Sequence, residues 1–240
     1  MMNDRIDGIV VNQIDYKEND QIISIINKQY GKISLYVKGY KKINSKNASA
    51  CQLLDYSSFL LDYYPSKNIQ VLKSASLIEQ FYSIKQDYQK IAISSLMCEI
   101  INQTDSIYDF DLLMNSLTLL EKTDQPYLIL NLFLAQQLRQ IGIAPYVDGC
   151  VICNNNNIET ISISDGGFLC RSCNEGQIEK MPVEFLKKFR YINKASFDKY
   201  DKLLSLDLND FKLTDMLVDI MVNYSGIKLN SYRLLTNINY

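Results

Sequence analysis

Four of the six cysteines form two C-x₂-C pairs, and the chain contains no histidine. A C-x₂-C step places two thiolates on one tight turn, and two such turns that face each other make a tetrahedral cage of four sulfurs. The 16 residues between the pairs are a spacing typical of structural zinc modules. The sequence therefore predicts one structural Zn²⁺ per chain. Its ligands are Cys150, Cys153, Cys170 and Cys173.

The same thiols have two alternative uses, a pair of disulfides or an iron site, because a cage of four sulfurs also suits iron. The absence of histidine excludes the mixed Cys/His sites. Four thiolates leave no open coordination position for water, so we expect a structural metal that does not act as a Lewis acid.

The segment between the cysteine pairs has the pattern of a β-hairpin. Residues 158–164 alternate roughly between apolar and polar side chains, residues 165–167 (DGG) supply a turn, and residues 168–169 lead back to the second pair. Asn154 and Asn174, which follow the two pairs, tolerate the left-handed conformation that such turns need. The sequence thus predicts a small hairpin closed by metal.

The remaining cysteines indicate the environment of the chain. Cys51 and Cys98 lie in apolar surroundings, which is typical of reduced core residues. No apolar run is long enough to span a bilayer, and the N-terminus lacks the basic-then-apolar layout of a signal peptide. We expect a protein of the reducing cytoplasm that does not contact a membrane. The net charge of −2 argues against a general binder of polyanions.

The N-terminal third of the chain is typical of β structure. Five candidate strands are separated by turn or loop residues. They cover residues 5–14, 21–26, 33–37, 53–62 and 69–77. Five strands in so short a segment favour a small closed barrel of the OB type, with an SH3-like barrel as the main alternative.

From about Ser76 to Ile101, apolar residues recur at helical spacing. Further helices are predicted over residues 109–120, 127–141, 182–191 and 210–224. We therefore expect an α+β protein with an OB-type barrel over residues 1–80 and a helical domain over residues 81–240. The Cys₄ module, residues 146–178, is inserted within the helical domain.

Residues 31–50 contain five lysines and no acidic residue. Such a charge run is often only a solvated face. Here it follows the third predicted strand, where ammonium groups could contact a phosphate backbone while tyrosine rings stack on bases. The candidate rings are Tyr36, Tyr40, Tyr63 and Tyr64. Core packing is the commoner role for any one tyrosine, and Tyr40 is the best candidate for stacking because it lies among the lysines.

No catalytic constellation is apparent. The chain lacks a phosphate-binding G-x-x-x-x-G-K-[ST] loop, a dinucleotide fingerprint and a paired-histidine metalloprotease helix. Asp15, Glu18 and Asp20 cluster before the second strand, but scattered loop carboxylates are usually solvated. We expect neither enzymatic activity nor a small-molecule substrate.

Five strings stand out in order along the chain: residues 8–11 (GIVV), 19–20 (ND), 30–33 (YGKI), 37–42 (VKGYKK) and 138–145 (LRQIGIAP). Together they resemble the RecO family of bacterial DNA repair proteins, and the resemblance covers nearly the whole chain. It implies binding to single- and double-stranded DNA and annealing of complementary strands in the bacterial cytoplasm, at the nucleoid. It also implies that the protein, with RecR, loads recombinase onto DNA coated by single-strand-binding protein.

The resemblance implies site residues as well. The DNA-binding segment would be carried by Lys38, Lys41, Lys42 and Lys46, to which the stacking argument adds Tyr40. The acidic C-terminal tail of single-strand-binding protein docks on the helical domain of the family, and Arg139 is a candidate contact.

Two features depart from the family. The basic segment often contains arginines, and here it is all lysine. The family's Ser-Arg step near the C-terminus reads Ser231-Tyr232-Arg233. Because lysine cannot make bidentate phosphate contacts, we expect weaker and more salt-sensitive DNA binding. The alternative function is a zinc-stabilised scaffold for protein interactions with only incidental DNA contact.

Overall fold

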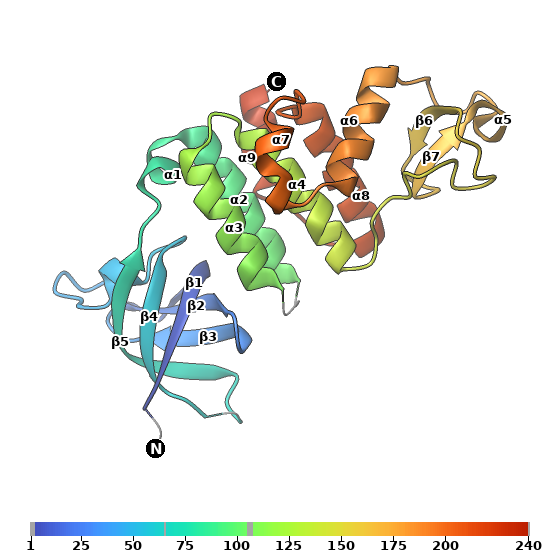
Figure 1. The fold of residues 1–240 in the computed structure, drawn as a ribbon. Coiled ribbons are helices and arrows are strands. Elements are labelled where there is room, and N and C mark those ends of the chain that lie inside the picture. Colours follow the sequence, from blue (N-terminus) through green and yellow to red (C-terminus); the bar gives the residue numbers. More distant parts are fainter. Residues whose placement is uncertain (1–2, 65, 105–107, 240) are drawn as a thin grey trace. The chain divides into compact units, whose positions relative to one another are not determined.

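The computed structural model describes residues 3–64, 66–104 and 108–239 (Figure 1). The chain divides into two compact units. The first consists of Met1–Lys122 with Ser231–Ile238, and the second of Thr123–Asn230 with Asn239–Tyr240. The predicted barrel is therefore part of a larger first unit that also contains helices. The predicted domain boundary at residue 80 stays a prediction.

The first unit is built on a closed five-stranded barrel. Its strands are β1 (Asn3–Tyr16), β2 (Asp20–Asn27), β3 (Gly31–Val37), β4 (Tyr56–Asp62) and β5 (Ile69–Glu79). They are hydrogen-bonded in the order β1-β2-β3-β5-β4, and β1 closes the barrel on β4. All pairs are antiparallel except β3 with β5. This arrangement confirms the predicted OB-type barrel.

The barrel forms because apolar residues alternate along its strands. Ile23 and Ile25 on β2, and Leu35 and Val37 on β3, are fully buried in its core. The intervening side chains face outward, as the period of two requires. One prediction is wrong at its edge: β4 begins at Tyr56 rather than residue 53. Residues 53–55 instead turn, with the N–H of residue 54 bonded to the Val10 carbonyl at 2.9 Å.

The prediction of helical structure from about Ser76 is also wrong at its start. Leu77 and Ile78 belong to β5, where they are 42% and 50% exposed. Strand pairing with β4 continues to Glu79 and overrides the local periodicity. Helices follow at once. They are α1 (Tyr82–Gln86), α2 (Tyr88–Gln103) and α3 (Asp109–Lys122).

Polar contacts join the barrel to these helices within the first unit. Lys28 forms an ion pair with Asp111 on α3, at 2.9 Å. Lys85 on α1 forms one with the fully buried carboxylate of Asp55, at 2.7 Å. The unit also includes α9 (Tyr232–Asn239), which the sequence pattern did not predict. The N–H of Ser231, just before α9, donates to Glu99 on α2 at 2.8 Å.

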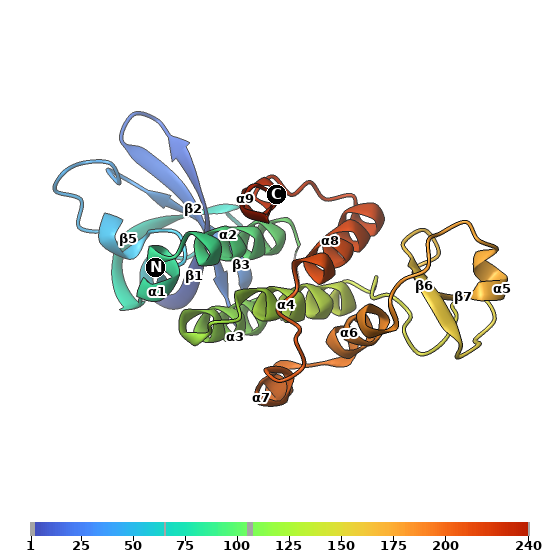
Figure 2. The ribbon, with the colours of Figure 1, turned by 90° about the horizontal axis from the view of Figure 1, so that it is seen from above.

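The second unit is a helical layer with the Cys₄ module beside it (Figure 2). The helices are α4 (Pro126–Gln140), α6 (Val183–Lys194), α7 (Tyr200–Leu203) and α8 (Phe211–Ser225). α4 is buried along most of its length and packs against α6 and α8. The module contains the predicted hairpin, β6 (Ile158–Ser162) and β7 (Gly167–Cys170), followed by the short α5 (Arg171–Asn174). Among the described residues, no helix has the length and apolar character needed to cross a membrane.

Candidate metal centre and nucleic-acid interface

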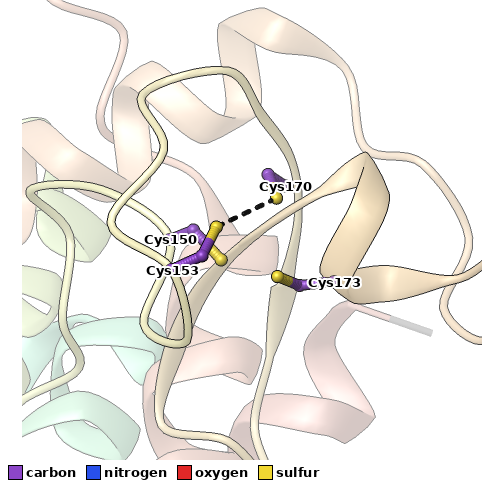
Figure 3. Close-up of side chains that lie close together, drawn as sticks. All are labelled: Cys150, Cys153, Cys170 and Cys173. Carbon is purple, nitrogen blue, oxygen red and sulfur yellow. Dashed lines mark hydrogen bonds between the residues drawn. The ribbon is translucent and has the colours of Figure 1, made fainter.

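The structure brings the four predicted metal ligands together (Figure 3). Their Sγ atoms all lie within 4.8 Å of one another, and the Sγ atoms of Cys153 and Cys170 are 3.6 Å apart. A tetrahedral Zn²⁺ with bonds of about 2.3 Å requires sulfurs roughly 3.8 Å apart. All four cysteines are free thiols. The donor set and its spacing therefore fit one tetrahedral metal ion held by four thiolates.

The backbone around the cysteines shows why this sequence makes such a cage. Asn154 adopts the predicted left-handed conformation, with φ of 60°, and its N–H donates to the Cys150 carbonyl at 2.8 Å. After the second pair the left-handed residue is Glu175 and not Asn174. The Asn174 side chain instead bonds the backbone of Ile178, through both its amide nitrogen and its oxygen. The prediction of a left-handed asparagine was right for one turn and wrong for the other.

Contacts within the second unit hold the hairpin that carries Cys170. A Cβ atom on Gly167 would lie 2.3 Å from the Tyr146 carbonyl oxygen, so this position must be glycine for the two segments to pair. The Tyr224 hydroxyl on α8 lies 2.7 Å from the Ile163 carbonyl oxygen and 3.0 Å from that of Ser164, at the hairpin turn. Both ends of the hairpin are thus fixed, one by the cysteines and one by α8.

Electrostatics in the cage favour a bound cation. The Ser172 hydroxyl and the backbone N–H of Cys173 lower the pKa of Cys170 to about 6. The neighbouring Cys153 sulfur, followed by burial, raises the pKa of Cys173. The pKa of Cys150 is lowered as well and that of Cys153 is raised, so two thiols ionise readily while the other two resist further negative charge. A divalent cation removes that conflict, since it is bound by thiolates.

The lysines of the predicted DNA-binding segment lie in the β3–β4 connection. Lys38, Lys42 and Lys46 are exposed, and no ion pair involves them in the described part of the chain. Lys41 differs, because its ammonium lies 2.7 Å from the Asp15 carboxylate. Among the described residues, the segment thus offers three ammonium groups that form no ion pair and one that is partly neutralised.

Asp20, one of the carboxylates that the sequence suggested were merely solvated, holds this segment in place. Asp20 accepts hydrogen bonds from the Tyr36 hydroxyl at 2.5 Å and from the Gly39 N–H at 2.7 Å. These two donors, in that order, lower the pKa of Asp20. The Lys41 N–H also donates to the Asn19 carbonyl at 3.0 Å. The lysine turn is therefore anchored to the β1–β2 turn.

The four candidate tyrosines have different surroundings. Tyr40 packs partly against the barrel core, and its hydroxyl accepts a hydrogen bond from Gln13 at 3.2 Å. Burial raises the pKa of Tyr40. Tyr63 also packs against the core, and its ring lies 5.4 Å from that of Tyr30. The Lys67 ammonium lies 4.3 Å from the Tyr64 ring. Tyr36 lies on the outer face of β3, the strand that leads into the lysine segment.

A feature that sequence reasoning missed is a row of side chains across the outer face of the barrel. Ile14 pairs with Ile22, Ile22 with Tyr36, and Tyr36 with Val71, so four neighbouring strands contribute one residue each. We call these four residues the outer row. Ile14 and Val71 are 55% and 45% exposed, and the other two are half-buried. The alternation along each strand indicates that these residues face outward. Only the strand register shows that they are neighbours.

A cation accompanies the outer row. The ammonium of Lys17, in the β1–β2 turn, lies 5.3 Å from the centroid of the Tyr16 ring and 5.8 Å from that of Tyr36. The two rings meet edge to face, 5.7 Å apart. Lys17 was not among the predicted site residues, because it lies outside the lysine run and between acidic neighbours.

Arg139, the predicted partner contact, lies near the end of α4. Its guanidinium donates to the carbonyl oxygens of Asn193 and Ala195, at 2.5 and 2.6 Å, and so caps the C-terminal end of α6. Burial lowers the pKa of Arg139. The side chain also lines a hollow of about 400 Å³ that includes Pro145 and Lys194.

Comparisons with known proteins agree with this architecture. A family model described as "Recombination protein O N terminal" matches residues 1–81, and one described as "Recombination protein O C terminal" matches residues 85–233. "DNA repair protein RecO" of Acetivibrio thermocellus is 31% identical over 221 residues, covering 87% of this chain and 85% of the relative.

Two further relatives carry the same name. That of Bacillus pumilus is 26% identical and covers 97% of this chain and 93% of its own. That of Listeria monocytogenes is 26% identical over the same shares of the two chains. Because the two family models together span nearly the whole chain, it belongs to the RecO family of DNA repair proteins.

Proposed function

We propose that this protein binds DNA through the outer face of its barrel and anneals complementary strands. The observation that carries the proposal is the anchored lysine turn. Lys38, Lys42 and Lys46 present exposed ammonium groups, and Asp20 and Asn19 fix the backbone that bears them. Ammonium groups bind the phosphate backbone without reading sequence, which suits annealing of any two complementary strands. No covalent bond is made or broken in this reaction.

The outer row supports contact with unpaired bases. Ile22 and Tyr36 form its centre, and the ammonium of Lys17 lies beside it. Base stacking on an aromatic ring such as that of Tyr36 is sequence-tolerant and worth roughly 1–3 kcal/mol per base. Duplex DNA hides its base faces and would use only the lysines. The proposal therefore includes binding of both forms, with a preference for single strands.

Partners follow from the family. We propose that the protein acts with RecR in the bacterial cytoplasm, at the nucleoid, and receives the acidic tail of single-strand-binding protein. The hollow beside Arg139 suits such a tail, because Pro145 offers an apolar wall and Lys194 a second cation. Lys194 already pairs with Asp148 at 2.5 Å, so the tail would compete with that carboxylate. The role of Arg139 in partner binding stays a prediction.

The test is a titration of fluorescent oligothymidine with the full chain at several salt concentrations. The triple variant Lys38→Gln, Lys42→Gln and Lys46→Gln should lower the slope of log K against log salt by about 2, since each phosphate contact of a single strand contributes about 0.7. A control with the same charge change uses exposed lysines of the second unit. It carries Lys180→Gln, Lys199→Gln and Lys202→Gln. Equal slopes for the triple variant and the wild type would remove the assignment.

A second experiment distinguishes the DNA-binding proposal from the scaffold alternative. Protein partners are captured on the full chain with and without nuclease treatment. A DNA-dependent mediator should lose DNA-bridged partners after nuclease treatment. A scaffold should keep every partner and show no change with the triple lysine variant.

A further inference from the structure

The second unit contains a groove whose character is opposite to that of the Arg139 hollow. It lies between the first turns of α6 and the first half of α8, with a volume of about 470 Å³. Its apolar lining consists of Met181, Pro182, Phe185 and Met216. Two flexible methionines beside an aromatic ring form a surface that adapts to different apolar partners. We call this the acidic groove because of its charged rim.

The rim carries more acidic than basic side chains. Four carboxylates line it, Glu184, Asp210, Asp215 and Asp219, against the ammonium groups of Lys188 and Lys212. Lys188 is already compensated, since it lies 2.7 Å from Asp207 and 3.2 Å from Asp210. The Glu184 pair with Lys187, at 3.0 Å, is exposed on both sides and therefore weak. The groove thus presents a net negative field.

Helix capping explains only part of this charge. Asp210 is the N-cap of α8 and Glu184 lies in the first turn of α6, where carboxylates complement the helix dipole. Asp215 and Asp219 lie beyond the first turn of α8, where that effect has faded. They are four residues apart on one helix face, a spacing at which like charges destabilise a helix. Burial and the charge of Asp215 raise the pKa of Asp219.

We propose that the acidic groove docks a basic amphipathic segment of a protein partner, with its apolar side chains against Phe185 and Met216 and its cations against the exposed carboxylates of Glu184 and Asp219. The negative field of the rim attracts a cationic side chain. The same field repels an acidic tail or a nucleic acid. The acidic groove and the Arg139 hollow then select partners of opposite charge. This inference does not depend on the proposed DNA surface.

The test uses the full chain and two fluorescein-labelled peptides. One is an amphipathic helix of leucine and lysine, and the other has glutamate in place of each lysine. At low salt the lysine peptide should bind at least about ten-fold more tightly, since juxtaposed like charges disfavour the glutamate peptide. The double variant Glu184→Gln with Asp219→Asn should weaken lysine-peptide binding by roughly five-fold, from two exposed ion pairs.

A matched control removes two exposed carboxylates of the same unit outside the groove, through Glu179→Gln with Asp201→Asn. This control should bind the lysine peptide as the wild type does. Equal weakening in both double variants would mean that only the net charge matters, and the proposal would be wrong. It would also be overturned if the glutamate peptide bound as tightly as the lysine peptide, or if neither peptide bound.

Discussion

Asp15 should act as an intramolecular competitor of DNA for Lys41. The two side chains form an ion pair of 2.7 Å, and both are partly exposed, at 37% for Lys41 and 68% for Asp15. The hydrogen bond from Lys41 is the main cause that lowers the pKa of Asp15, so this carboxylate is ionised at neutral pH. A phosphate that reaches Lys41 must displace Asp15 and also meets its repulsion. Removing the carboxylate should therefore strengthen DNA binding.

The expected size follows from the exposure of the pair. Exposed ion pairs are weak, so Asp15→Asn should tighten oligothymidine binding by only about two- to five-fold at low salt. Lys41→Gln should change the salt slope by less than the full value of about 0.7 in the wild type, and by the full value in the Asp15→Asn background. This is a double-mutant cycle, which isolates the coupling between the two residues.

Fluorescence anisotropy between about 50 and 200 mM salt provides the measurement. Glu18→Gln is the matched control, because it removes one exposed carboxylate from the same turn, and no ion pair of Glu18 is found in the described ranges. The reasoning is refuted if Asp15→Asn leaves affinity unchanged, or if Glu18→Gln strengthens binding as much. In the second case the effect would be one of net charge alone.

Three further predictions concern the cage, the barrel support and the lysine turn. Metal analysis should find about one zinc per chain, and Cys150→Ser should lower the melting temperature by roughly 10 °C and abolish its sensitivity to chelator. Lys85→Met should destabilise the chain to urea by about 3 kcal/mol, since it leaves the buried Asp55 carboxylate with hydrogen-bond donors but no cation, and adding Asp55→Asn should recover part of the loss. The hydrogen bond from the Gly39 N–H to Asp20 should persist above a pH of about 3.9, the usual carboxyl pKa. It should be lost as the pH falls through the lowered pKa of Asp20 in the folded protein, and hydrogen exchange of the Gly39 amide should then become faster. Unchanged exchange at low pH would contradict this prediction.

The sequence predicted the cage because its signal is local. Each C-x₂-C step fixes two ligands within one turn, and the spacing of the pairs needs only a hairpin between them. The barrel was predictable for a similar reason, since alternation along each strand reports which side faces the core. The helix prediction was wrong at Leu77 and Ile78 because these apolar residues are exposed and lie in neither the core nor a helix. Their conformation is set by the pairing of β5 with β4.

Strand register and the contacts between distant side chains could not be predicted from the sequence. The outer row exists only because Ile14, Ile22, Tyr36 and Val71 become neighbours across four strands. The roles of Asp15 and Asp20 likewise depend on the β3–β4 connection returning to the β1–β2 turn. Nothing in the sequence distinguishes the four predicted lysines. Only the structure shows that Lys41 forms an ion pair, whereas Lys38, Lys42 and Lys46 form none in the described ranges.

The chain path of the first unit has a consequence for folding. Residues 123–230 leave this unit and form the second one before the chain returns as α9. Until that intervening stretch is folded, α9 must find its place at the end of a very long flexible loop, at a cost in closure entropy that grows with loop length. A folded second unit fixes the separation of residues 123 and 230 and shortens the loop in effect. Completion of the unit that bears the barrel is therefore linked to folding of residues 123–230.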